Sequence, residues 1–309
     1  MPRGTHGEKI VSAIENEKLP KSDIPRLKEA LKKYDAWVKA LNGASAPSMD
    51  ELVEKMVCLL NEYKQYIDVD LIFDSEEDFL YRQKGQLKLD NTIMEEFLPI
   101  FIKKCLETHT DYNISNLEIG SQVATFSSMY FKSSLSSMEH GGGMNIKAKD
   151  QDFSMSRTLY VKSSYSPTFD ERDSVTAVTH LGYVLAEIKT NLDKTMFQEG
   201  SATAHDVKQA VTGAKYFLLC DFLDMTPIST TTTDIDEILI TRKAKRLSSN
   251  VRSKFNTYKG RQESRAAYVR FLQENPYSKD VLKRFLNHII SQLENEDLIE
   301  DSVLNHGYF

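Results

Sequence analysis

Two charged side chains stand two residues apart near the end of the stretch "LGYVLAEIKT", residues 181–190. Its first half is apolar and β-branched, which is typical of a strand buried on both faces. In a strand, residues i and i+2 point to the same side, so Glu187 and Lys189 share one face. A carboxylate there can hold Mg²⁺ through oxygen, and the neighbouring ammonium can hold or polarise a water molecule. The pair therefore suits metal-assisted hydrolysis of a phosphodiester.

A Glu-x-Lys tripeptide is weak evidence by itself, since about one or two copies are expected by chance in a chain of this length. A second copy, Glu62-Tyr63-Lys64, falls inside a predicted helix. There the two side chains would stand about 200° apart around the helix axis, which is too far to form one compact site. The copy at Glu187 lies instead between predicted strands and a helix. A solvated strand end is the alternative interpretation.

A site of this kind needs a second carboxylate from an adjacent strand. Asp152, in "KAKDQDFSMS", precedes an extended segment that can pair antiparallel with the Glu187 strand. A hairpin brings the start of one strand beside the end of the next, and this geometry favours Asp152. Asp170, in "SPTFDERD", is closer in sequence but lies in the expected turn. Asp170 stays open as an alternative, together with Asp150 and Asp173.

Three regions with different patterns surround these residues. Residues 1–110 show helical periodicity, including an apolar stripe within residues 24–41 and the capping-box pattern Ser48-x-x-Glu51. Residues 111–233 are rich in strand formers and predict three strands, a helix and a further strand. Residues 234–309 are expected to be mostly helical again. The short stretch "HGGGM", residues 140–144, predicts a hairpin turn.

The third region carries a basic stretch that could follow a phosphate backbone. From Arg242 to Arg270 the chain holds ten Lys/Arg and a single acid, Glu263, with three aromatic residues between them. Such a stretch can give DNA binding that depends on salt. A solvated basic helix face is the alternative. The residues expected to contact DNA are Arg242, Lys243, Lys245, Arg246, Arg252 and Lys254.

Composition narrows the class of protein. The 309 residues fit one large domain or two smaller ones. The net charge of −6 says little about the charge of a local DNA-binding groove. Cys58, Cys105 and Cys220 have no CxxC spacing, so neither a zinc site nor a disulfide framework is expected, and reduced thiols suit a cytoplasmic protein. No run of eighteen apolar residues occurs, so no membrane span is expected. The absence of Walker, GxGxxG and GxSxG motifs argues against nucleotide binding and α/β-hydrolase chemistry.

Longer segments resemble a known family. The stretches "LAEIKTNLDKTMFQE", "TAHDVKQAVTGAKYFLLCDFLDMTP" and "TDIDEILITRKAKR" are similar to type II restriction endonuclease subunits of the BbvCI kind. The order Asp, long gap, Glu-x-Lys resembles the PD-(D/E)XK nuclease core. The resemblance covers about residues 145–250, roughly a third of the chain. It implies an α/β fold with a restriction-endonuclease-like core, a mixed sheet flanked by helices, between a helical N-terminal region and a helical C-terminal part.

The resemblance also implies an activity. It implies a Mg²⁺-dependent endonuclease that cuts duplex DNA at a short asymmetric site, acts with a second nuclease subunit, related or identical, and works in the cytoplasm of a bacterium. The metal-binding acid and the catalytic pair carry over to Glu187 and Lys189. Asp152, which hairpin geometry favours, is expected to be the second catalytic and metal-binding acid. No Pro-Asp dipeptide precedes Glu187, which departs from the wider motif and leaves the first acid open.

Three regions with different roles are expected. Residues 111–233 would form the nuclease core that the resemblance implies, and the basic stretch predicts that residues 234–309 contact DNA. Residues 1–110 are expected to form a helical region that takes part in DNA recognition. Two alternatives remain. One is a DNA-binding partner subunit that recognises sequence without cleavage, and the other is an RNA- or structure-specific nuclease of the same superfamily.

Overall fold

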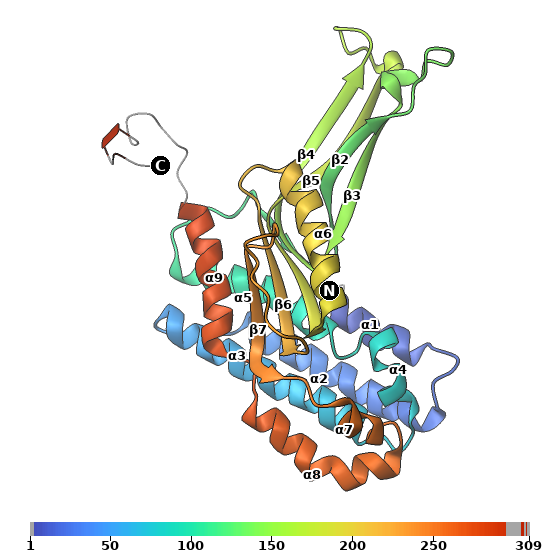
Figure 1. Cartoon of the computed structure of the whole chain (residues 1–309), viewed down its shortest axis with the longest axis vertical. Helices are drawn as coiled ribbons and strands as arrows, with labels where there is room; N and C mark the ends of the chain where they lie inside the picture. Colours follow the sequence, from blue (N-terminus) through green and yellow to red (C-terminus); the bar gives the residue numbers. More distant parts are fainter. Residues whose placement is uncertain (1–2, 295–303, 306, 308–309) are drawn as a thin grey trace.

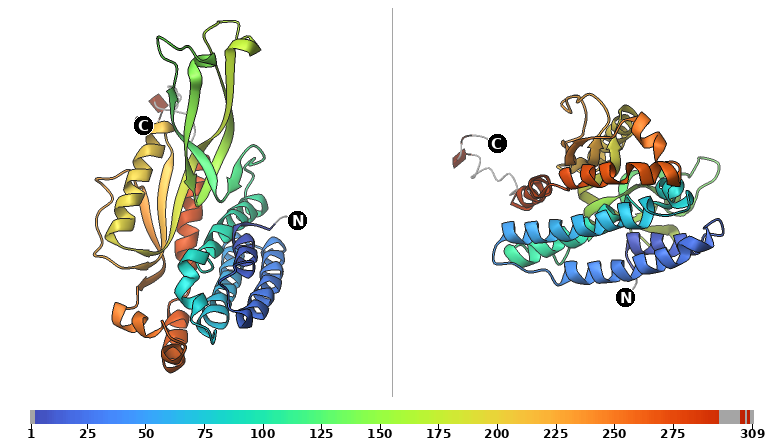
Figure 2. Two further views of the ribbon diagram at one scale, coloured as in Figure 1. Left: turned by 90° about the vertical axis from the view of Figure 1, so that its right-hand side faces the viewer. Right: turned by 90° about the horizontal axis from the view of Figure 1, so that it is seen from below.

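The computed structural model describes residues 3–294, 304–305 and 307. A seven-stranded mixed sheet forms the centre of the molecule. Helices pack around its lower half, while two β-hairpins extend from its upper half as a projecting arm (Figures 1 and 2). No helix in the described part has the length and apolar character that a membrane span requires.

The N-terminal region is helical, as its periodicity predicts. Ser48 caps a helix by accepting a hydrogen bond from the backbone N–H of Glu51 at 3.3 Å, so the predicted cap is confirmed. Pro99 lies inside a helix that continues on both sides of it. The elements are α1 (Thr5–Ile14), η1 (Lys21–Asp23), α2 (Ile24–Asn42), α3 (Met49–Gln65), the π-helix η2 (Tyr66–Phe73), α4 (Phe79–Leu87) and α5 (Thr92–His109).

The sheet is organised around its longest strand, β5. This strand pairs antiparallel with β4 over most of its length, and its second half pairs in parallel with β6, which in turn pairs in parallel with β7. The β2–β3 hairpin joins β5 at Thr125 and His180. The strands are β1 (Glu118–Gly120), β2 (Val123–Phe131), β3 (Met144–Gln151), β4 (Phe153–Ser164), β5 (Ser174–Leu192), β6 (Lys215–Leu223) and β7 (Glu237–Lys245).

The remaining helices follow the strands. The helix α6 (Lys194–Ala210) begins directly after β5, where a helix is predicted. The last elements are α7 (Ser249–Lys254), α8 (Tyr258–Glu274) and α9 (Lys279–Glu294). In its described part, the segment from residue 234 is mostly helical as expected. It nevertheless opens with strand β7, so the sheet continues past residue 233. The sequence analysis did not predict this strand, because its short apolar run merges with the basic run that follows.

The two faces of β5 pack against different helices. Val184, Ala186 and Ile188 join the large core formed with the N-terminal helices and α9. Leu185 points the other way and joins a smaller core with α6. Because side chains alternate along a strand, Glu187 and Lys189 share the face of Leu185. The fold therefore presents both residues on the α6 side of the sheet.

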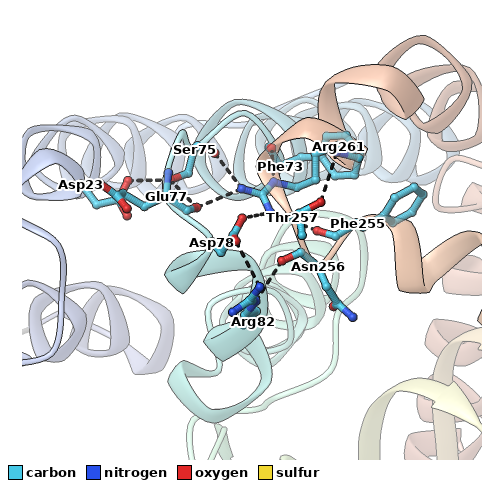
Figure 3. Close-up of polar contacts among 11 residues, drawn as sticks. Asp23, Phe73, Ser75, Glu77, Asp78, Arg82, Phe255, Asn256, Thr257 and Arg261 are labelled. Carbon is cyan, nitrogen blue, oxygen red and sulfur yellow. Dashed lines mark hydrogen bonds and ion pairs between the residues drawn. The ribbon is translucent and has the colours of Figure 1, made fainter.

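A buried arginine fixes the C-terminal helices to the N-terminal region (Figure 3). The Arg261 side chain from α8 is fully buried and forms an ion pair of 3.0 Å with Asp78. Its guanidinium also donates to four backbone carbonyl groups, those of Phe73, Ser75, Glu77 and Phe255, at 2.9–3.0 Å. Arg261 belongs to the basic stretch, so at least this residue has a structural role and is not free to bind DNA.

Candidate active site

The β4–β5 hairpin brings the two predicted acids together. Phe153 pairs with Ala186 in the antiparallel register, so Asp152, one residue earlier, arrives opposite Glu187. The carboxylate of Asp152 accepts a hydrogen bond from the backbone N–H of Ile188 at 2.9 Å, which fixes it against β5. The predicted antiparallel pairing of these two segments is confirmed.

The expected Glu-x-Lys pair is in contact on β5. The Lys189 ammonium lies 2.7 Å from Oε1 of Glu187, and the hydroxyl of Tyr216 on β6 donates to Oε2 at 3.0 Å. Burial lowers the pKa of Lys189, but the hydrogen bond and charge of Glu187 outweigh it, and the pKa is raised. Burial and then the charge of Glu187 raise the pKa of Tyr216. Lys189 is therefore cationic and Tyr216 a neutral donor at neutral pH.

A third acid, which the sequence analysis missed, lies beside Asp152. Glu95 on α5 is buried, and its Oε2 accepts a hydrogen bond from the amide of Gln122 at 2.8 Å. The same amide donates to Asp152 at 3.3 Å, so Gln122 links the two acids. Burial, followed by the charge of Asp152, raises the pKa of Glu95 to about 7.

Only an indirect sequence signal pointed to Glu95. It lies in "IMEEFLPIFI", where two acids interrupt an apolar run, and all residues of the run from Ile93 to Leu98 are buried. An acid at a buried helix position needs a compensating partner or a function. Its hydrogen-bond partner Gln122 lies 27 residues further along the chain, and Asp152 lies further still, so periodicity alone could not identify the contact. Tyr216 was missed for the same reason.

The structure places the alternative acids away from this cluster. Asp150 is exposed on β3, opposite Ala124. Asp170 and Asp173 lie in the turn between β4 and β5, beyond the Ser164–Ser174 pair. At about 3.3 Å per residue along β5, that turn lies about 40 Å from Glu187. Asp152 is therefore the only one of the four candidate acids that the fold sets beside the Glu-x-Lys pair.

The expected DNA contacts need one correction. Arg242 is buried: its guanidinium donates to the backbone carbonyl of Asn275 at 2.8 Å and lies 4.1 Å from the ring centre of Tyr277. Asp68 lies 3.8 Å from the same group. Arg242 follows the buried Thr241 near the end of the edge strand β7, and its contacts with Asp68, Asn275 and Tyr277 hold the side chain inside. Arg242 is thus not available to a DNA backbone.

The other five basic residues lie nearer the surface. Lys243 pairs with Asp280 at 3.0 Å, and Arg246 pairs with Asp224 at 2.8 Å. Arg252 donates to the carbonyl of residue 247 at 3.0 Å. Lys245 and Lys254 are exposed, and no ion pair is formed by either within the described residues. These two ammonium groups are the ones most free to approach a phosphate.

The three acids match a hard divalent cation in the type of donor atom that they offer. Asp152, Glu187 and Glu95 offer carboxylate oxygens, the donors that Mg²⁺ prefers. The buried Oε1 of Glu95 has no hydrogen-bond partner among the described residues, which leaves one oxygen uncompensated. Across residues 3–294, however, no three His, Cys, Asp or Glu side chains already stand together as a metal site. Lys189 and Tyr216 instead bond to the carboxylate of Glu187, and the backbone N–H of Ile188 bonds to that of Asp152.

Comparison with known proteins gives a fold and a family. No curated protein matches the sequence. Among solved structures, the chain is similar to one described as "native BbvCI A2B2 tetramer at low resolution", with a TM-score of 0.60, 16% identity, and coverage of 94% of this chain and 97% of that chain. At this identity the similarity shows the restriction-enzyme fold alone. The model of the Bpu10I restriction endonuclease family, in contrast, matches residues 86–309, well over half of the sequence. The chain therefore belongs to the Bpu10I restriction endonuclease family.

Proposed function

We propose that this chain is the catalytic subunit of a type II restriction endonuclease that hydrolyses phosphodiester bonds of duplex DNA at a short specific site with Mg²⁺. The observation that carries the proposal is the β4–β5 register, which sets Asp152 opposite Glu187 with Lys189 on the same face. Family membership supports the reaction class. The cytoplasm of a bacterium is the location that such an enzyme would have.

Each residue of the cluster has a distinct role in this proposal. Asp152 and Glu187 would hold the cation, and the uncompensated oxygen of Glu95 would add a further ligand or a hydrogen-bonded water. When bound, the cation neutralises charge on the scissile phosphate. Tyr216 and the backbone N–H of Ile188 hold the two acids in position.

Lys189 contributes a fixed positive charge. Since Glu187 raises its pKa, Lys189 keeps its proton at neutral pH and can donate hydrogen bonds to the attacking water or to a phosphate oxygen. Charge that develops on the phosphate in the transition state is stabilised by such a preorganised donor. Loss of the ammonium should therefore reduce turnover far more than DNA binding.

Duplex cleavage needs a second active centre. One Asp and one Glu-x-Lys cluster make one centre, which cuts one strand at a time, so two chains most simply supply the two cuts. The similar solved structure is an A2B2 tetramer, with two kinds of subunit. It supports a second nuclease subunit, related or identical, as the partner of this chain. Lys243, Lys245, Arg246, Arg252 and Lys254 are the proposed contacts to the DNA backbone.

A pair of acid variants tests the catalytic assignment. Asp152→Asn should abolish plasmid cleavage, whereas Asp170→Asn should cleave like the parent protein, because Asp170 lies in the distant turn. Cleavage would be followed on gels with Mg²⁺ and, as a control, with EDTA, using the chain together with its second subunit. The reverse pattern of activities would refute the assignment of the first acid.

The same assay separates the alternatives. Discrete fragments that require Mg²⁺ support a restriction endonuclease. Sequence-specific binding with no cut attributable to this chain would indicate a recognition-only partner subunit. Degradation confined to RNA or to branched DNA would indicate another specificity within the superfamily.

A further inference from the structure

A cavity of about 380 Å³ lies where the three parallel strands end. Strands β5, β6 and β7 run in the same direction, so their carboxyl ends meet at one edge of the sheet. Beyond this edge, side chains from α4, α7 and α8, in the lower part of Figure 1, close the cavity. In open α/β sheets, ligands bind in the crevice outside the carboxyl ends of the strands. The volume lies in the range of small-molecule sites, about 300–1,000 Å³.

Aromatic rings form much of the cavity wall. Tyr268 on α8 stacks on Phe73 with the ring centres 4.3 Å apart, and Phe222 on β6 stacks on Phe271 with the centres 5.5 Å apart. Flat rings of this kind offer a stacking surface to a planar ligand such as a nucleobase. The five rings that line the cavity are those of Tyr81, Phe222, Phe255, Tyr268 and Phe271.

Two hydroxyl groups in the cavity are free to bind a ligand. The side chains of Tyr81 and Tyr268 line the cavity, and their hydroxyls form no hydrogen bond within the described residues. Burial raises the pKa of Tyr268, so this phenol keeps its proton at neutral pH and can both donate and accept. A few polar groups among apolar walls fix the orientation of a ligand.

The floor of the cavity is charged, but its charges are already paired. Lys64 contacts both carboxylate oxygens of Asp68 at 2.6 Å, and Lys84 lies 3.1 Å from Asp90. The carboxylate of Asp221 accepts hydrogen bonds from two hydroxyl groups, at 3.1 and 2.8 Å. A phosphate placed here would face three acids beside cations that are already engaged. The floor therefore suits the uncharged part of a ligand.

The rim of the cavity carries positive charge. Residues 246–256 form this rim, and Ser253 within it is exposed. Arg246 pairs with Asp224 at 2.8 Å. Arg252 uses only Nε, which donates to the carbonyl of Leu247 at 3.0 Å, so its two Nη groups have no partner in the described part of the chain. A planar guanidinium with free N–H groups matches two oxygens of a phosphate.

The aromatic wall is held in place by the Arg261 contacts of Figure 3. The Arg261 guanidinium donates to the backbone carbonyls of Phe73 and Phe255 at 2.9 and 3.0 Å. Phe255 lines the cavity, and Phe73 supports the ring of Tyr268. A preformed site binds its ligand at a lower entropic cost than a flexible one.

We propose that this cavity binds one nucleotide, with its base among the aromatic rings and its phosphate at Arg252. Two sources can supply it: a nucleotide of bound DNA that is turned out of the duplex, or a free nucleotide. The first source rests on the proposed nuclease function. It also agrees with position, because Thr190 lines the cavity and directly follows Lys189 on β5. A base that leaves the duplex needs a pocket that stacks on its faces and binds its edge.

Equilibrium dialysis of the full chain in EDTA, without DNA, tests the site with the four deoxynucleoside 5′-monophosphates. At least one should bind with a dissociation constant below about 1 mM. Tyr268→Phe removes one hydrogen bond and should raise this constant about three- to tenfold. Tyr258→Phe is the matched control, because Tyr258 lies on the same helix outside the cavity, and it should bind like the parent protein.

A second pair of variants tests the cavity by filling it. Ser253→Trp places a large ring at the rim and should prevent binding at millimolar concentration. Ser291→Trp, at an exposed position on α9, should bind like the parent protein. Circular dichroism would verify that all variants are folded. A parent chain that binds no monophosphate at about 5 mM would overturn the proposal. So would parental binding by both Tyr268→Phe and Ser253→Trp.

The orientation of the ligand has its own test. Arg252→Gln removes the charge-assisted hydrogen bonds and should weaken binding of the monophosphate about tenfold. Binding of the matching nucleoside, which has no phosphate, should stay unchanged. Equal losses for the monophosphate and the nucleoside would overturn the assignment of the phosphate to Arg252.

Added DNA distinguishes the two sources. The chain, together with its second subunit, would be loaded with labelled monophosphate in EDTA, which prevents cleavage. It would then be mixed with a duplex that carries the cleavage site, mapped from the ends of plasmid fragments. Release of the label by this duplex, but not by a duplex without the site, would assign the cavity to a nucleotide of the DNA. Label that stays while the duplex binds would assign it to a free nucleotide. Dialysis without DNA measures no cleavage, so its failure leaves the nuclease assignment untouched.

Discussion

Replacing Glu95 by glutamine should stabilise the metal-free protein at alkaline pH and have little effect at pH 5. The Glu95 carboxyl has a pKa of about 7 in the folded protein, against an ordinary value of 4.5, because of burial and the nearby charge of Asp152. Between these two values, the folded state binds more protons than the unfolded state. The free energy of unfolding therefore falls as the pH rises through this window.

The size of the effect follows from the shift. A difference of about 2.5 pKa units, at 1.36 kcal/mol per unit, corresponds to about 3 kcal/mol above pH 7. Glu95→Gln removes this ionisation, so its advantage over the parent should grow from less than about 1 kcal/mol at pH 5 to about 3 kcal/mol at pH 8.5. Urea unfolding in EDTA at several pH values would measure it.

A matched control lies on the same helix. Glu107 is half exposed and forms a loose ion pair of 3.8 Å with Lys103, so Glu107→Gln should show no comparable pH dependence. A stability difference between Glu95→Gln and the parent that is the same at pH 5 and pH 8.5 would refute the reasoning. Added Mg²⁺ extends the test at pH 8.5. It should stabilise the parent more than Glu95→Gln, because a ligand that binds only the folded state stabilises it.

Three further outcomes are expected. Arg261→Met should lower the free energy of unfolding by about 3–5 kcal/mol in urea unfolding, because it leaves several buried acceptors unpaired. Arg265→Met, at a partly exposed ion pair, should lower it by less than about 1 kcal/mol. Lys245→Gln and Lys254→Gln should each lower DNA affinity and reduce the slope of log affinity against log salt concentration by about one. An unchanged slope in binding titrations would show that these residues only face solvent. In a mixed complex, Lys189→Ala in this chain alone should leave nicking of one defined strand; linear product at the parental rate would show that this chain supplies no essential centre.

Local patterns predicted most of the elements. Helix α2 followed from its apolar stripe, the start of α3 from Ser48, and the β4–β5 hairpin from two extended segments around a polar turn. These features depend on residues close in sequence, which is why they can be predicted without an alignment. The position of Asp152 beside Glu187 followed as well, because hairpin geometry relates the two strand ends.

Long-range packing limited the rest. Glu95 reaches Asp152 only because α5 packs against the sheet, and Arg242 is buried because it contacts Asn275 and Tyr277, which lie far along the chain. The basic stretch was interpreted by charge, although Arg242 and Arg261 serve the interior. A count of basic residues does not distinguish a guanidinium that binds buried carbonyls from one that faces solvent. Arginine suits both environments because its five donors can satisfy several acceptors at once.

Strand register connects the acid cluster to the rest of the sheet. A slip of one residue between β4 and β5 would turn Asp152 to the opposite face and separate it from Glu187. Just above the cluster the register does shift: Met155 pairs with Val184, but Ser156 pairs with Gly182, and Tyr183 is left over. Such bulges bend strands and change which way side chains point. The bulge thus separates two segments of the β4–β5 hairpin. Packing in the buried core fixes the register of the lower segment, whereas the side chains of the outer arm are not constrained by that core.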